Sequence, residues 1–392
     1  MGTSFLRRLA AWGTLLALAG CIDRYVPAVP EASQTYLVVD GFINSQGSTQ
    51  VLLSRTFSLS THPAAPPAET KATVAILDDA GRRYPLAESS AGTYTSPAQT
   101  LDPTRRYQLR IITSQGRDYV SDLVPVKTTP PIDQLTWQPK ADGVQLYLSA
   151  QDATGSSRYY RWDYEETWQY TSAYRSTDEY VRSLDLLRTR TDDIYNCWRT
   201  EPSTNIRQAT TATLTRDALV DYPLSFIPFF TSEKLRVRYS ILVRQTAQTE
   251  AEYNYWELLR KNTEALGTLN DPVPVPLSGN VHALADASER VLGYVSAHSV
   301  TEQRIFIDHN DFVLPRPNVG NYPYLTCDLD TLGLVNSRLP SQAALPIFRA
   351  GGYVPVQAIR DSQGNIIAYS GSSAECVDCR LRGTNVKPSF WR

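Results

Sequence analysis

The chain has 392 residues, of which 42% are hydrophobic and 20% are charged, and its formal net charge is −2. This hydrophobic content allows large buried cores, so we predict a globular chain of two or more domains. The nearly balanced charge offers no basic surface for nucleic acid, which excludes a nucleic-acid partner. The 23 tyrosines and 7 tryptophans, against one methionine, favour a strand-rich extracytoplasmic protein.

Residues 1–20 have the parts of a bacterial export signal. Arg7 and Arg8 precede an apolar run that ends in Leu18-Ala19-Gly20-Cys21. A cysteine directly after this Leu-Ala-Gly sequence predicts lipoprotein processing, in which the thiol becomes a diacylglyceryl cysteine, cleavage precedes it, and a further acyl chain such as palmitate can be added. A spanning helix needs about 20 apolar residues, which this run does not supply. We therefore predict that Cys21 is lipidated and anchors the mature chain.

The residues after Cys21 indicate in which membrane the lipoprotein resides. Prolines at 27 and 30 predict that residues 21–34 form a short tether. Ile22, rather than an aspartate, follows Cys21. By analogy with the proteobacterial sorting rule, we expect an outer-membrane location, and the sequence leaves open whether the protein faces the cell surface or the periplasm.

Residues 35–130 alternate short strand patterns with turn clusters. The strand patterns lie at 36–39, 50–53, 72–77, 107–112 and 118–120. Their even spacing and period-two alternation, with no helical pattern, predict a β-sandwich of the immunoglobulin or fibronectin type. Pro130 and Pro131 end it, because consecutive prolines cannot sit inside a central strand.

Residues 131–392 are predicted to form a larger β-rich domain with one amphipathic helix near 249–266. Thr249 and Glu252 form a capping-box pair at its start, and Gly267 stands where it would stop. Its expected apolar face consists of Ala251, Tyr255, Leu258 and Leu259. Prolines, asparagines and glycines break every periodicity between 314 and 352. That segment is either a binding surface or an excursion pinned by Cys327.

The segment 159–170 is the most aromatic of the chain. On a strand, one face carries Tyr160, Trp162, Tyr164, Glu166, Trp168 and Tyr170, and the other carries Arg161, Asp163, Glu165 and Thr167. The aromatic face is either a sandwich interior with the charged face in water, or a surface for a ligand. Glu166 supports the second interpretation, because a carboxylate in an apolar stripe needs a partner or a ligand. Our candidates for a ligand or partner surface are Trp162, Tyr164, Glu166 and Trp168.

Four cysteines remain besides Cys21, namely Cys197, Cys327, Cys376 and Cys379. An even number in an oxidising compartment predicts disulfides, with three connectivities that the sequence leaves open. Cys376 and Cys379 also have the spacing of half a zinc site or of a redox dithiol, but no second pair completes a zinc site and no helix pattern follows. We expect both to staple the C-terminal segment to the body, with Cys327 as a candidate partner.

Several stretches taken together resemble one family, the Bacteroidota lipoproteins known as domain of unknown function 4249. The stretches are Leu37–Gly41, Trp162–Trp168, Arg238–Arg244, Tyr255–Trp256, Ser278–His282, Gly293–Tyr294, Arg304–Ile307, Cys376–Gly383 and Lys387–Trp391. The resemblance implies an outer-membrane lipoprotein encoded beside TonB-dependent transporters, with an accessory role in uptake or envelope function. It supplies no catalytic residues.

The sequence contains no nucleophile elbow, zinc-protease motif, phosphate-binding loop or dinucleotide fingerprint. The densest set of potential ligands is Asp308–Asp311, which is also typical of a polar loop after a strand. We therefore predict no catalytic residue, no metal and no cofactor. We expect the protein to act as a non-catalytic accessory or binding component of a TonB-dependent transporter system. Two alternatives are a surface-anchored hydrolase and a structural or adhesion protein of the envelope.

Overall fold

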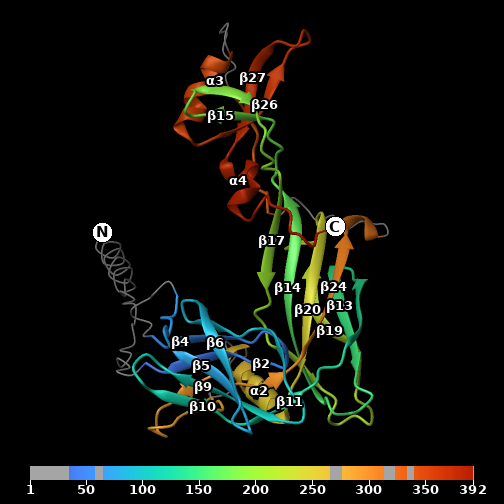
Figure 1. The fold of residues 1–392 in the computed structure, drawn as a ribbon. Helices are drawn as coiled ribbons and strands as arrows, with labels where there is room; N and C mark the ends of the chain where they lie inside the picture. Colours follow the sequence, from blue (N-terminus) through green and yellow to red (C-terminus); the bar gives the residue numbers. More distant parts are fainter. Residues whose placement is uncertain (1–34, 58–64, 265–275, 313–322, 333–339, 392) are drawn as a thin grey trace, which may run out of the picture.

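A computed structural model describes residues 35–57, 65–264, 276–312, 323–332 and 340–391. They form two β-sandwiches side by side and a smaller module beyond the far end of the second sandwich (Figure 1). The structure is mainly β, which confirms the predicted fold class. The predicted signal peptide, the lipidation site Cys21, the tether and the helix stop at Gly267 lie outside the described residues.

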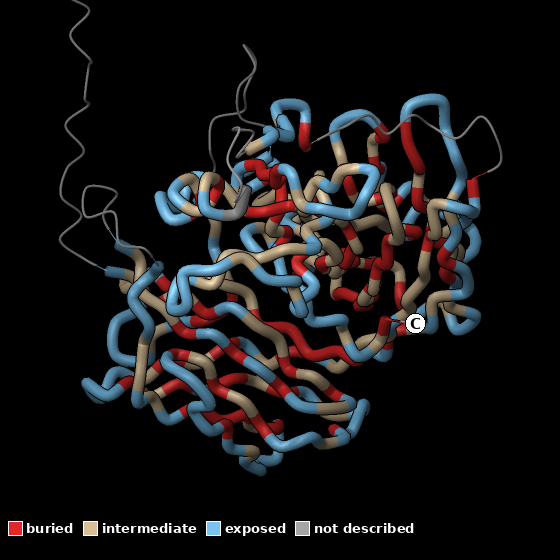
Figure 2. Tube along the Cα trace, turned by 90° about the horizontal axis from the view of Figure 1, so that it is seen from above, coloured by how far each residue is buried: buried red, intermediate tan, exposed pale blue. Residues whose placement is uncertain are grey.

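The first sandwich is of the immunoglobulin or fibronectin type predicted from the sequence. Its strands before residue 130 are β1 (Leu37–Gly41), β2 (Ile43–Asn44), β3 (Gln46–Gly47), β4 (Gln50–Arg55), β5 (Thr73–Asp78), β6 (Arg83–Ser90), β7 (Thr93–Thr95), β8 (Gln99–Thr100), β9 (Arg106–Ile112), β10 (Asp118–Ser121) and β11 (Val124–Lys127). Alternate residues of β9 point inward, and Tyr107, Leu109 and Ile111 are fully buried. In Figure 2 buried segments recur along the strands between intermediate and exposed ones, and the burial of alternate residues in β9 is what period-two patterning requires.

A later part of the chain returns to this first sandwich. Its strands are β21 (Val281–Ala283), β22 (Val291–Leu292) and β23 (Ala297–His298). β22 runs parallel to β1, β23 runs parallel to both β2 and β11, and β21 pairs with β10. Val295 between them is fully buried in the first core. The division predicted at residue 130 therefore needs correction for residues 281–298, whose strands are too short for their partners to be read from the sequence.

The second sandwich packs a three-stranded sheet against a five-stranded sheet. The strands are β12 (Ile132–Pro139), β13 (Gly143–Gln151) and β19 (Ala218–Pro228) in one, and β14 (Tyr159–Thr171), β17 (Asn196–Pro202), β18 (Arg207–Thr210), β20 (Arg238–Ala247) and β24 (Val300–Asp308) in the other, with the 3-10 turn η1 (His309–Asp311) after β24. Thr129 ties the two sandwiches together, because its Oγ1 accepts from Ala247 N at 3.0 Å and its N donates to Ser299 Oγ at 2.9 Å.

Helix α2 (Glu250–Glu264) is the predicted amphipathic helix, and it lies between the two sandwiches (Figure 1). Thr249 caps it, accepting from the backbone N of Glu252 at 3.2 Å. The Glu252 side chain is buried at 3% exposure and accepts instead from Ser296 Oγ at 3.0 Å. The expected apolar face is wrong in part, because Ala251 is exposed while Glu252 and Tyr255 are the buried positions.

The third module combines an excursion between β14 and β17 with the C-terminal part of the chain. Its elements are β15 (Asp178–Val181), β16 (Leu186–Thr189), β25 (Asp330–Leu332), α3 (Pro340–Ala350), β26 (Val354–Arg360), β27 (Ile366–Ser372), α4 (Ala374–Val377) and η2 (Cys379–Leu381). The sequence did not predict α3, which carries Pro346 inside it, or the four-residue α4. The tail after η2 returns to the second sandwich, where Trp391 packs against Phe306.

Two disulfides clamp the neck between this module and the second sandwich. Cys197 is bonded to Cys379, and Cys327 is bonded to Cys376. The predicted disulfides are confirmed. Cys376 and Cys379, the two cysteines of the Cys-x-x-Cys pair, belong to different bonds. That arrangement leaves neither thiol for zinc or for a redox dithiol. Bonds that close such long loops restrict the unfolded chain and typically contribute about 2–4 kcal/mol each.

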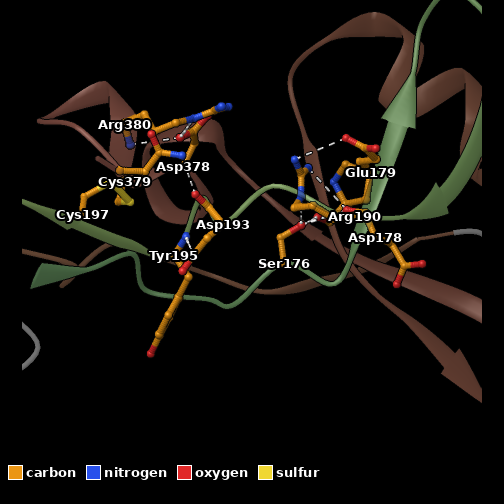
Figure 3. A network of polar contacts seen from close by, with 12 residues as sticks. Ser176, Asp178, Glu179, Arg190, Asp193, Tyr195, Cys197, Asp378, Cys379 and Arg380 are labelled. Carbon is orange, nitrogen blue, oxygen red and sulfur yellow. Dashed lines mark hydrogen bonds and ion pairs between the residues drawn. A yellow bond between two sulfur atoms is a disulfide. The ribbon is translucent and has the colours of Figure 1, made fainter. Parts of the chain in front are cut away.

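A polar network extends the clamp into the module (Figure 3). Arg190 Nε donates to Ser176 Oγ at 2.8 Å, and its Nη1 lies 3.6 Å from Glu179 Oε2. Burial lowers the pKa of Arg190, and the carboxylate of Glu179 opposes that shift. On the other side of the neck, Cys379 N donates to Ile194 O at 2.9 Å. The neck is thus held by covalent, ionic and backbone bonds together.

We predict that Gly293→Ala destabilises the protein more than Gly364→Ala. Both glycines have positive φ, at +126° and +88°. A Cβ at Gly293 would lie 2.0 Å from Val39 O, whereas nothing lies within 4 Å of one at Gly364. Backbone strain alone should cost about 1–2 kcal/mol, and overpacking against β1 should add about 1–3 kcal/mol. Urea unfolding followed by circular dichroism measures both, and equal losses would contradict the close approach of the returning segment to β1.

Candidate functional site

The structure places the predicted aromatic surface inside the second sandwich. Trp162 is fully buried, Trp168 is 3% exposed, and Tyr164 is 7% exposed. The Trp162 indole donates to Gln245 Oε1 at 2.8 Å within the core. The prediction of a ligand surface formed by Trp162, Tyr164, Glu166 and Trp168 therefore needs correction, because the facing three-stranded sheet covers this stripe.

Glu166 has its partners within the protein. Lys234 Nζ lies 2.6 Å from Glu166 Oε2, and the Tyr239 hydroxyl donates to Oε1 at 2.7 Å. Burial, and then the carboxylate of Glu166, raise the pKa of Tyr239 well above its usual range. Glu166 and Tyr164 border a cavity of about 370 Å³ that opens beside β19. The carboxylate in the apolar stripe is thus satisfied by a partly buried ion pair and a buried hydrogen bond, as its burial requires.

A larger hollow lies where α2 meets both sandwiches, and we call it the cleft. Its outer compartment has a volume of about 630 Å³ and is lined by parts of β1, β14, α2 and the segment before β23. Its apolar wall consists of Val38, Ile206, Tyr255, Trp256, Leu259, Leu277 and Leu292. Junctions between domains are common places for small-molecule sites of this volume.

An inner compartment of about 70 Å³ adjoins the outer one and is lined mostly by polar groups. The two share the lining residues Asp40, Arg161, Asp163, Trp256 and Tyr294. The Arg161 guanidinium lies 3.7 Å from the centre of the Trp256 ring and donates to Asp163 Oδ1 at 3.1 Å. The cleft therefore combines an apolar outer wall with a charged inner end.

Two buried ionisable groups form the floor of the inner compartment. Glu252 is 3% exposed, and burial raises the pKa of its carboxyl, while Gln248, Ser296 and Arg161 oppose the shift. His298 is also 3% exposed and stacks on Phe42 with the ring centres 4.2 Å apart. Burial, with a smaller contribution from the charge of Arg161, lowers the pKa of His298 to about 3. The imidazole is therefore neutral at physiological pH.

Local sequence patterns predict little of this site. The pattern of β14 is compatible with Arg161 and Asp163 in water, Glu252 is part of a predicted capping box, and His298 belongs to no motif. They meet because α2 covers the charged face of β14 and the returning segment brings His298 beside it. Four of the stretches that carry the family resemblance contribute lining residues: Leu37–Gly41, Trp162–Trp168, Tyr255–Trp256 and Gly293–Tyr294.

The part of the chain that the structure describes contains no metal-binding cluster and no helix that could span a membrane. Asp308 of the Asp308–Asp311 cluster lies 3.4 Å from Arg238 Nε, and its backbone N donates to Asp311 Oδ2 at 2.7 Å. Within the described ranges, no three histidine, cysteine or acidic side chains gather closely enough to hold a metal. The helices described there are too short or too polar to cross a membrane.

Most of the chain matches one known protein family. The family described as domain of unknown function (DUF4249) matches residues 22–304. The chain belongs to this family. No curated protein sequence matches this DUF4249 protein.

Three solved structures show partial similarity to this DUF4249 protein. A segment of two fibronectin type III domains from chicken tenascin has 10% identity and a TM-score of 0.17, covering 54% of this chain and 91% of the segment. Chitinase ChiA74 from Bacillus thuringiensis has 10% identity and a TM-score of 0.15, covering 51% of this chain and 29% of the chitinase. Adhesin InvE from Yersinia pseudotuberculosis has 13% identity and a TM-score of 0.14, covering 54% of this chain and 55% of the adhesin.

We predict that Glu252 makes the stability of the protein fall as the pH rises. Its folded pKa is raised, so the folded state holds a proton that the unfolded state releases near pH 4.5. The contribution of Glu252 is therefore complete below that pH and is lost as the pH rises through the folded pKa. Glu252→Gln keeps an acceptor for Ser296 and should match the wild type at pH 4 and exceed it at pH 8.

Urea unfolding across pH 4–8 measures this difference, with Glu250→Gln as the control. Glu250 is the exposed neighbour in the same helical turn, so its substitution should not change the pH dependence. A Glu252→Gln variant that is less stable than the wild type at pH 8 would show that the ionised carboxylate stabilises the fold through Arg161.

Proposed function

We propose that this DUF4249 protein is an outer-membrane lipoprotein that acts as a non-catalytic binding component, in partnership with a TonB-dependent β-barrel transporter. The cleft is the observation that carries the binding function. It joins an apolar wall to buried polar groups at a domain junction, which is the usual composition of a small-molecule site. The transporter partner follows from the family resemblance of the sequence.

The architecture supports an anchored presentation of this cleft. The described chain begins in the first sandwich, and the third module lies at the opposite end of the molecule (Figure 1). A lipid at Cys21 would therefore hold the first sandwich nearest the membrane. Two disulfides cross-link the neck between the third module and the second sandwich. A protein of this shape can contact a membrane partner with one end while its cleft stays accessible.

We predict that Cys21→Ser yields an unprocessed or soluble precursor in place of an outer-membrane protein. Each acyl methylene buried in the bilayer contributes about 0.8 kcal/mol of membrane affinity, and the variant would lack all of it. Membrane fractionation after a high-salt wash measures the partition. Wild-type levels of the variant in the outer membrane would contradict the lipoprotein assignment.

The transporter partnership is tested by purifying the full-length lipoprotein with a C-terminal tag from native membranes in mild detergent. We expect a β-barrel transporter to co-purify in stoichiometric amount with the wild type and to be absent with Cys21→Ser. An unrelated tagged outer-membrane lipoprotein at equal abundance controls for barrels carried over in detergent. Equal recovery with that control, or no barrel with the wild type, would contradict the partnership.

A further inference from the structure

We propose that the cleft binds a small amphipathic organic cation, with a protonated amine in the inner compartment and an apolar body in the outer one. This inference rests on the binding function proposed above and adds the chemistry of the ligand. Three features of the cleft carry it: the shape of its apolar wall, the balance of its charges, and a buried nitrogen that lacks a partner.

The apolar wall fits a body of the size of an aromatic ring with a short chain. Val38 and Leu292 come from the first sandwich, and Trp256 and Leu259 come from α2, so the wall has two facing sides. The outer volume of about 630 Å³ lies within the range of small-molecule sites. The Arg161 guanidinium covers one face of the Trp256 ring, at 3.7 Å from the ring centre. The apolar body of the ligand can therefore stack only on the opposite face.

The charges that line the cleft favour a cation. Asp40 and Asp163 line both compartments, and Arg161 is the cation that faces them. The Arg161 guanidinium is already engaged through Nη2 by Asp163 at 3.1 Å and by the ring of Trp256, and its buried Nε has no hydrogen-bond partner among the described residues. Asp40 is exposed and has no hydrogen-bond or ion-pair partner within the described ranges. The lining is therefore negative even when the Glu252 carboxyl is uncharged, and an anionic head group would be repelled.

The inner compartment also holds buried nitrogens that are unpartnered within the described ranges, of which His298 Nδ1 is the one that can accept a hydrogen bond, the other two being the donors Arg161 Nε and Trp256 Nε1. His298 is 3% exposed, and its Nδ1 has no hydrogen-bond partner among the described residues. Buried polar atoms in folded proteins are rarely left in that state without water or a ligand. When the proton of the neutral ring is on Nε2, Nδ1 accepts a hydrogen bond. The volume of about 70 Å³ beside it has room for an ammonium group or for water.

A ligand series with one body and three head groups tests the proposal. We would titrate 3-phenylpropylamine, 3-phenylpropan-1-ol and 3-phenylpropanoate into the full-length lipoprotein in detergent micelles by isothermal calorimetry, and subtract the heats of the same micelles without protein. The amine should bind at least tenfold more tightly than the carboxylate, which corresponds to about 1.4 kcal/mol, with the alcohol between them. The preference for the amine should weaken as salt is added.

Variants locate the binding and its cause. Asp40→Asn should weaken the amine at least fivefold and leave the alcohol unchanged. Leu259→Ala should weaken all three ligands alike. Asp133→Asn removes an exposed carboxylate of the second sandwich that does not line the cleft, and it should change none of them. Thermal unfolding of each variant confirms that it is folded.

Three results would overturn the proposal: a carboxylate that binds as tightly as the amine, an amine affinity that Asp40→Asn does not change, or no binding of any of the three at millimolar concentration. None of them depends on recovery of a β-barrel from membranes. An amine that binds as expected without a co-purified transporter would overturn the proposed partnership and leave the ligand class standing.

Discussion

The pairing of residues 281–298 with the first sandwich is the constraint on which the rest of the structure depends. β22 lies parallel to β1, and β23 lies parallel to β2 and β11, so the chain must leave the second sandwich after β20 and come back again. Helix α2 starts that return path and is therefore held between the two sandwiches. Ser299 then bonds to Thr129 where the chain enters the second sandwich again. The sandwiches are thus joined by three passages of the chain, near residue 130, through α2 and at Ser299, rather than by one linker.

The buried charges of the cleft follow from that constraint. Helix α2 contacts β14 on one side and the returning segment at Tyr294 on another, while Glu250, Ala251 and Asn254 stay exposed. Glu252 is enclosed at the contact, and its raised pKa is the electrostatic cost of the position. Arg161 and Ser296 offset part of that cost. Ionisable groups held against desolvation in this way are found disproportionately at functional sites, which makes the cleft, rather than the ion pair of Glu166, the better candidate.

The neck has a different physical basis. The third module has a small core of its own around Ala344, Phe348 and Tyr369. Small cores rarely supply enough stability alone, and cross-links compensate by restricting the unfolded chain. Cys197–Cys379 and Cys327–Cys376 each join the C-terminal part of the chain to earlier segments. The two cross-links therefore stabilise the module at the place where it joins the second sandwich.

The sequence alone determined the features that depend on local pattern: the sandwich class, the start of α2 at Thr249, and the two faces of β14. Each rests on residues close together in the chain. The tertiary structure decided which face of β14 lines a cavity that could hold a ligand. The aromatic face became a core, because the facing sheet covers it, and the charged face of Arg161 and Asp163 became a cleft, because a helix 90 residues later covers it in part. The disulfide pairing and the place of His298 were likewise fixed by contacts between distant segments, which no local pattern encodes.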